Sequence, residues 1–149
     1  MNIRLLYISQ SGNTRAFVTK LVDYAKKLNG PQFEAVEIND LTPDHHETEP
    51  YFVFVPTYLD GGNGIDTGVK EIMTNALYDY LDYGNNARHL LGVIGSGNKN
   101  FNIQYVLTAK RYAETFGAPL IADYELRGTE HDIDRIYQAL CQRIKAVSN

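Results

Sequence analysis

The sequence has one cysteine, no tryptophan and no excess of basic residues among its 149 residues. A lone cysteine, Cys141, cannot form a disulfide within the chain or a cysteine metal site. The formal net charge of −4 argues against nucleic acid and membrane surfaces as partners, because both usually need clusters of basic residues. No apolar run reaches the length of a membrane span, and the chain begins on a strand-like segment instead of a signal peptide. We therefore expect a cytoplasmic protein.

Several catalytic motifs are also missing. The chain lacks the lysine of a Walker A loop, the G-x-G-x-x-G dinucleotide fingerprint and the G-x-S-x-G elbow of hydrolases. A cysteine phosphatase is excluded because Cys141 lies in a C-terminal helical pattern. The adjacent His45 and His46 point in different directions and have no third ligand at helical spacing, so we expect a loop there and no metal site. No side chain is assigned a catalytic role, and any chemistry would belong to a cofactor.

The apolar pattern alternates between buried strands and amphipathic helices. Strands are expected at 3–8, 33–38, 51–55, 89–94 and 120–124, and apolar residues recur at helical spacing over 17–28, 69–81, 106–116 and 133–144. Thr129 and Asp132 can form a capping box for the last helix. This order predicts one α/β domain, 1–149, with a doubly wound parallel sheet and helices on both faces.

The segment Ser9-Gln10-Ser11-Gly12-Asn13-Thr14 joins the first strand to the first helix. Unpaired backbone N–H groups and the helix dipole favour an anion at a helix N-terminus, and the hydroxyl groups of this segment add donors. The segment is therefore interpreted as a cup for one terminal phosphate. A simpler interpretation, in which Ser11 or Asn13 only caps the helix, stays open.

Two further loops follow core strands, at 56–64 and 95–101, and both are rich in glycine. In a doubly wound sheet, loops at the carboxyl ends of the strands form the ligand site. Tyr58 and Phe101 could stack on a planar ring, and glycines let the backbone approach its edge. Together the three loops predict a flavin mononucleotide (FMN) site. The alternative is that Tyr58 packs in the core and the glycines only form turns.

At this point the sequence resembles a known family. Residues 9–14 resemble the phosphate loop of flavodoxins. Pro56-Thr57-Tyr58 with Gly61-Gly62, the run 95–101 and Glu125-Leu126-Arg127-Gly128-Thr129 resemble the NrdI family, flavodoxin-like proteins that accompany class Ib ribonucleotide reductase. The resemblance covers essentially the whole chain and implies the flavodoxin-like strand order 2-1-3-4-5. The residues expected to bind the cofactor are Ser9, Gln10, Ser11, Gly12, Asn13, Thr14, Pro56, Thr57, Tyr58, Gly61, Gly62, Gly95, Ser96, Gly97, Asn98, Asn100 and Phe101.

The resemblance also implies a role. Members of the family bind FMN, take electrons from a flavodoxin or thioredoxin-type reductase, and pass superoxide or peroxide to the radical-bearing subunit, where a dimanganese–tyrosyl radical centre is assembled. The absence of tryptophan and the modest charge fit this role better than ordinary electron carriage. Leu59-Asp60 and Asn63-Gly64 make the second loop longer than in compact members, which leaves open which glycine faces the reactive edge. A general electron-transfer flavodoxin and a non-redox anion- or nucleotide-binding module are the alternatives.

Overall fold

The computed structural model describes residues 2–9, 12–59, 71–72, 75–99 and 106–148. Five strands form the main sheet, and four α-helices pack on it. The strands are β1 (Asn2–Tyr7), β2 (Gln32–Glu37), β3 (Tyr51–Pro56), β6 (Leu90–Gly97) and β7 (Leu120–Glu125). The helices are α1 (Asn13–Lys26), α2 (Asn75–Asp82), α3 (Leu107–Phe116) and α4 (Glu130–Val147). A 3-10 helix, η1 (Asn86–His89), precedes β6, and two short strands, β4 (Tyr58–Leu59) and β5 (Glu71–Ile72), form a separate antiparallel pair.

The main sheet is parallel throughout, in the order β2-β1-β3-β6-β7. Counted within this sheet alone, this is the order 2-1-3-4-5, so the expected fold is confirmed. The central strand β3 is buried over its whole length, as its unbroken apolar sequence predicts for a strand covered on both faces. All carboxyl ends of the strands therefore lie along one edge of the sheet.

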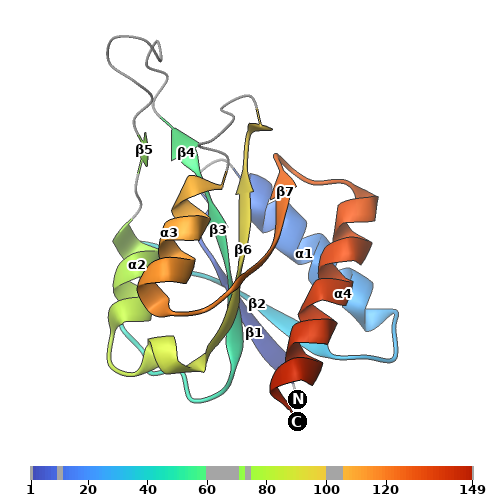
Figure 1. Ribbon diagram of the computed structural model, residues 1–149, viewed down its shortest axis with the longest axis horizontal. Coiled ribbons are helices and arrows are strands. Elements are labelled where there is room, and N and C mark those ends of the chain that lie inside the picture. Colours follow the sequence, from blue (N-terminus) through green and yellow to red (C-terminus); the bar gives the residue numbers. More distant parts are fainter. Residues whose placement is uncertain (1, 10–11, 60–70, 73–74, 100–105, 149) are drawn as a thin grey trace.

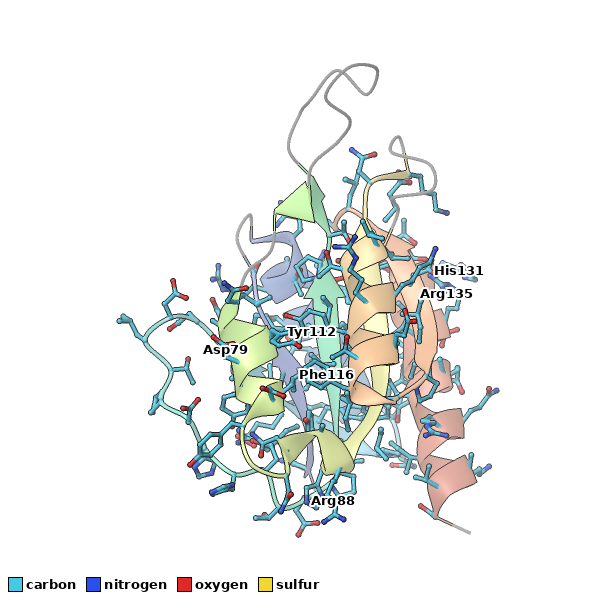
Figure 2. The ribbon with its side chains drawn as sticks, turned by 60° about the vertical axis from the view of Figure 1, so that its left-hand side comes forward. Asp79, Arg88, Tyr112, Phe116, His131 and Arg135 are labelled. Carbon is cyan, nitrogen blue, oxygen red and sulfur yellow. The ribbon has the colours of Figure 1, made fainter. Side chains whose placement is uncertain are left out.

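Helices cover both faces of the sheet (Figure 1). On one face α1 and α4 pack together, and their core includes Phe17, Leu21 and Leu140. On the other face α2 and α3 lie over Val53, Val55 and Val93. Figure 2 shows Tyr112 and Phe116 on α3, where both rings contact Tyr78 of α2. Among the helices of the described chain, none combines the length and apolar character needed to cross a membrane.

Two boundaries differ from the sequence expectation. The helix predicted over 69–81 begins only at Asn75 in the structure, and Glu71–Ile72 pairs with Tyr58–Leu59 as a strand. Hydrogen bonding to a neighbouring strand outweighs the helical spacing of the apolar residues there. The prediction of a loop that begins at Gly95 is also wrong, because Gly95–Gly97 continue β6 and pair with β3 and β7.

The segment between β2 and β3 is a mostly exposed loop, as expected, but its buried Glu47 anchors it at the amino edge of the sheet. Glu47 is only 6% exposed, accepts hydrogen bonds from Arg4 at 2.9 and 3.1 Å, and accepts another from the Tyr80 hydroxyl at 2.7 Å. The amide oxygen of Asn86 accepts from the Glu47 N–H at 2.7 Å. Burial and the adjacent carboxylate of Glu47 raise the pKa of Tyr80 to about 12. This network holds the segment against α2 and η1, far from the carboxyl edge.

Candidate functional site

The N-terminus of α1 lies at the carboxyl edge, directly after β1. Its N-cap is Gly12, which adopts a left-handed backbone with φ +87° and has no side chain to cap the helix. A Cβ atom built at Gly12 would meet no described atom within 4 Å. The first turn also contains no acidic residue. Neither the N-cap nor the first turn therefore places an acidic side chain at the positive end of the helix dipole, which lies at the edge where ligands of such sheets bind.

Ser9 organises the backbone of this turn. Its hydroxyl oxygen accepts hydrogen bonds from the N–H groups of Gly12 at 3.1 Å and Arg15 at 3.4 Å. The structure thus brings Ser9, Gly12, Asn13 and Thr14 together in one turn, as predicted. Thr14 is only 1% exposed, so its side chain lies beneath the turn. Gln10 and Ser11, also predicted to bind phosphate, lie outside the described residues.

The ends of β3 and β6 supply the second part of the edge. Pro56 pairs with Ser96 across the two strands, and the Thr57 N–H donates to the Ser96 carbonyl at 2.9 Å. The Thr57 hydroxyl accepts a hydrogen bond from the Thr108 N–H at 3.0 Å, so it satisfies a backbone donor in the first turn of α3. Sequence analysis placed Thr57 at the site but did not detect this capping role.

Some of the remaining predicted residues are described by the structure, and others lie outside it. Gly97 ends β6 and Asn98 follows it, whereas Gly95 lies against α3, where a Cβ atom would come within 2.7 Å of the Ala109 Cβ. Gly95 therefore has a packing reason to lack a side chain. Tyr58 is described as a backbone position in β4, without its side chain. In addition to Gln10 and Ser11, four predicted residues lie outside the described chain: Gly61, Gly62, Asn100 and Phe101.

Beside the α1 turn lies an ion pair that sequence analysis missed. The guanidinium of Arg15 donates to both carboxylate oxygens of Glu37 at 2.9 and 2.8 Å, and the Tyr7 hydroxyl donates to the same carboxylate at 3.3 Å. Hydrogen bonding from Arg15 lowers the pKa of Glu37, while burial raises the pKa of Tyr7. The only signal for this cluster is the parallel register of β1 and β2, which sets Tyr7 opposite Glu37 at the carboxyl edge, next to the start of α1.

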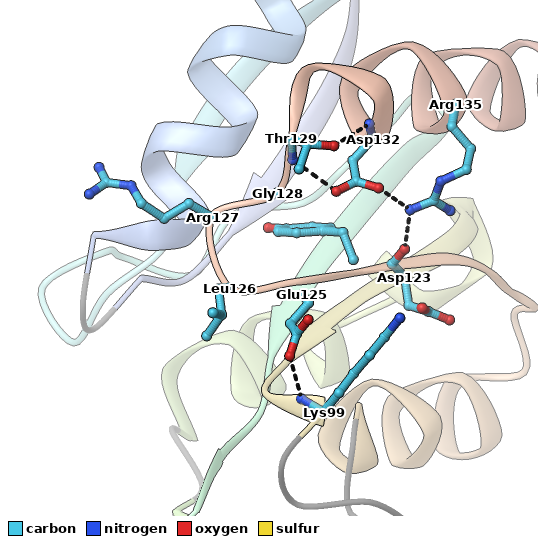
Figure 3. Close-up of a pocket in the computed structure, with 10 residues that line it drawn as sticks. Lys99, Asp123, Glu125, Leu126, Arg127, Gly128, Thr129, Asp132 and Arg135 are labelled. Carbon is cyan, nitrogen blue, oxygen red and sulfur yellow. Dashed lines mark hydrogen bonds and ion pairs between the residues drawn. The ribbon is translucent and has the colours of Figure 1, made fainter.

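A pocket of about 720 Å³ opens at the end of β7, between Lys99 and the first turn of α4 (Figure 3). Arg135 donates to the Asp123 carbonyl at 2.7 Å and to Asp132 at 2.8 Å, and Glu125 accepts from the Lys99 N–H at 3.0 Å. The pocket adjoins the end of β6, because the Leu126 N–H donates to the Gly97 carbonyl at 2.9 Å.

The turn between β7 and α4 explains the Leu-Arg-Gly-Thr motif in structural terms. Gly128 has φ +72°, and the Phe17 ring comes within 2.6 Å of where its Cβ would lie. Thr129 and Asp132 form the predicted capping box, with hydrogen bonds of 2.8 and 3.2 Å (Figure 3). The motif therefore positions α4 against α1.

Both histidines of the pair contact residues near η1. The His46 ring packs at a tilt against Tyr83, with 4.7 Å between ring centroids, and the His45 carbonyl accepts a hydrogen bond from the Asn86 amide nitrogen. Within the described ranges, no group of three or more His, Cys, Asp or Glu side chains is arranged to hold a metal ion.

Comparison with known proteins decides the family. Residues 5–138 match the family described as NrdI Flavodoxin like. The chain belongs to the NrdI flavodoxin-like family. It is 48% identical to a putative NrdI-like protein of Streptococcus pyogenes serotype M18, over 97% of this chain and 96% of the relative. It is 36% identical to protein NrdI of Bartonella tribocorum, over 89% of each chain.

Solved structures agree on the fold. A short-chain flavodoxin associated with a PDU bacterial microcompartment superposes with a TM-score of 0.67 at 20% identity, covering 100% of this chain and 99% of the other. Oxidised Flavodoxin 2 from Bacillus cereus gives a TM-score of 0.63 at 18% identity, with 96% and 99% covered. Membership in a flavodoxin-like family indicates a flavin as the class of ligand for this NrdI-family chain.

Proposed function

We propose that this chain binds FMN at the carboxyl edge of its sheet, with the phosphate group at the N-terminus of α1. The observation that carries the proposal is the left-handed Gly12 cap, which places no side chain over the N-terminus of α1 and has no described atom within 4 Å of where its Cβ would lie. A phosphate dianion is favoured there by the helix dipole and by the backbone N–H groups at the start of a helix. Because riboflavin lacks this phosphate, we expect the turn to distinguish the two flavins.

The residues near this turn suit such a ligand. Ser9 holds the backbone of Gly12 and Arg15 in place through its hydroxyl oxygen, which fixes the shape of the turn. Gln10, Ser11, Asn13 and Thr14 complete the proposed phosphate cup. The ring is proposed to lie between the segments that follow β3 and β6, with Pro56, Thr57, Tyr58, Gly61 and Gly62 on one side. Gly95, Ser96, Gly97, Asn98, Asn100 and Phe101 would form the other.

We further propose that the protein serves the radical-bearing subunit of a class Ib ribonucleotide reductase. Bound FMN would supply the electrons that reduce oxygen to superoxide or peroxide for assembly of the subunit's dimanganese–tyrosyl radical centre. A flavodoxin or thioredoxin-type reductase is the proposed electron donor, and the cytoplasm is the proposed location. Membership in the NrdI family supports this role over that of a general electron carrier.

A flavin titration tests the ligand. Purified protein mixed with FMN is expected to quench the fluorescence of the flavin and to shift its visible absorbance. Riboflavin, measured in parallel, is expected to bind more weakly because it makes no contact with the α1 turn. An FMN titration without either optical change would contradict the proposal and would favour a non-redox anion- or nucleotide-binding module.

A binding experiment tests the partner. The tagged flavin-loaded protein is expected to retain the radical-bearing subunit of a class Ib ribonucleotide reductase from the same organism. A flavodoxin loaded with FMN, such as the short-chain type that shares this fold, is the matched control and should not retain the subunit. Equal retention by both proteins, or by neither, would favour a general electron-transfer role.

A further inference from the structure

Arg15 is the only cationic residue in the first turn of α1, and it lies three residues after the Gly12 cap. Side chains in a helix lean toward its N-terminus, so the stem of Arg15 points back toward the turn formed by Ser9 and Gly12. The Arg15 N–H is itself part of that turn, because it donates to the Ser9 hydroxyl. The backbone of Arg15 thus belongs to the turn, and its charged guanidinium lies beside the turn, against Glu37.

The guanidinium has a defined position. Two hydrogen bonds of 2.9 and 2.8 Å join it to the carboxylate of Glu37, the last residue of β2. A bidentate pair of this kind fixes the plane of the guanidinium as well as its distance. Its side chain is still 52% exposed, so donors remain accessible from the solvent side of the carboxyl edge.

We propose that Arg15 contributes a positive charge to recognition of the flavin phosphate, and that Glu37 holds the guanidinium beside the turn. The inference rests on the proposed function, since it concerns the same phosphate group. Glu37 is thus a positioning residue for Arg15, and neither residue takes part in any redox step. The expected effect of Arg15 is selective, because only the phosphorylated flavin carries the charge that Arg15 would attract.

The test compares FMN and riboflavin binding to Arg15→Gln, Arg15→Lys and the parent protein by fluorescence quenching. Arg15→Gln is expected to weaken FMN binding by about five- to tenfold at low salt, the range of a charge-assisted contact that stays partly in water. Riboflavin binding should be unchanged. Arg15→Lys, which keeps the charge, should recover most of the loss. Because charges are screened over shorter distances as salt rises, the difference should shrink between about 0.1 M and about 1 M salt.

Two controls separate this role from indirect effects. Lys26→Gln removes a cation from the last turn of the same helix, where Lys26 pairs with Asp23 at 3.8 Å, and FMN binding should not change. The double variant Arg15→Gln/Glu37→Gln removes the carboxylate that the single change leaves unpaired. If the double variant bound FMN like the parent, the exposed carboxylate and not the lost cation would explain the effect, and the inference would be wrong.

The outcomes also separate this inference from the proposed function. If the parent binds neither flavin, the proposed function fails. If the parent binds FMN and Arg15→Gln weakens both flavins equally, Arg15 acts through the fold and the inference alone is overturned. If Arg15→Gln binds FMN with the same affinity as the parent, the inference is overturned as well.

Discussion

Gly12 and Gly128 both have positive φ angles, +87° and +72°, yet a methyl group would meet different surroundings at the two positions. At Gly12 it would meet no described atom within 4 Å, whereas at Gly128 it would collide with the Phe17 ring. The left-handed glycine before α4 therefore has a packing role, whereas no described contact gives the one before α1 such a role. Sequence alone cannot separate them, because the distinguishing contact joins residues more than a hundred positions apart.

Replacing Gly128 with alanine should lower the free energy of unfolding by about 2–4 kcal/mol. About 1–2 kcal/mol comes from the left-handed backbone, and the rest from overpacking against Phe17. The matched control is Gly117→Ala, with φ +69° and no described atom within 4 Å of its Cβ position. Urea unfolding followed by circular dichroism would measure both. Equal losses for the two variants would show that the Phe17 contact does not matter.

Replacing Thr14 with alanine should weaken FMN binding by about ten- to a hundredfold, the value of one hydrogen bond to a charged group, about 1.5–3 kcal/mol. Because Thr14 is only 1% exposed, Thr14→Ser is the necessary control: it keeps the hydroxyl but removes a buried methyl group. Fluorescence titrations of the parent and both variants would test this. Serine and alanine variants that bind FMN alike would assign Thr14 to packing.

At the scale of elements, Asn86 joins η1, α2 and the segment before β3. Its amide oxygen accepts from Glu47, and its amide nitrogen donates to the carbonyls of His45 and Tyr80 at 2.9 and 2.8 Å. The Tyr51 hydroxyl donates to the Asn86 carbonyl. The fully buried Asn86 side chain therefore satisfies backbone groups that would otherwise need partners in a helix or a sheet.

Asn86→Ala should lower the free energy of unfolding by about 2–4 kcal/mol, because it leaves buried backbone groups without partners. Asn85→Ala is the control: Asn85 is exposed, and its side chain makes no capping hydrogen bond among the described residues, so its effect should stay within about 0.5 kcal/mol. Chemical denaturation would compare them. FMN binding by folded Asn86→Ala should equal the parent's, since the network lies at the opposite edge of the sheet.

Sequence analysis predicted well those elements whose local apolar pattern and long-range contacts favour the same structure. The continuous apolar run Tyr51–Pro56 is a buried central strand, and the predicted capping box at Thr129 is formed. Prediction failed where a long-range contact overrides the local pattern. Glu71–Ile72 pairs with β4 instead of extending α2, and Gly95–Gly97 stay in the sheet because β3 and β7 hydrogen-bond on both sides.

At the scale of the whole molecule, strand order determines which segments meet. Once alternation of strands and helices predicts a parallel sheet, the segments after β1, β3 and β6 must share one edge, and the structure confirms that arrangement for their described residues. The ion pair of Arg15 and Glu37 was not predictable in the same way. It depends on the reach of one side chain across two strand ends, which no local pattern records.

Binding of FMN should stabilise the whole fold, because the turn of α1 and the ends of β3 and β6 exist together only in the native state. At an FMN concentration of about a hundred times the dissociation constant, the expected gain is about 2.7 kcal/mol, or about 5–10 °C in melting temperature for a chain of this size. At the same concentration, a variant that binds tenfold more weakly, such as Thr14→Ala, gains only about 1.4 kcal/mol. Thermal unfolding with and without FMN would show whether the shift in each variant follows its affinity. A melting temperature that did not respond to FMN would mean that the cofactor is not bound to this native structure.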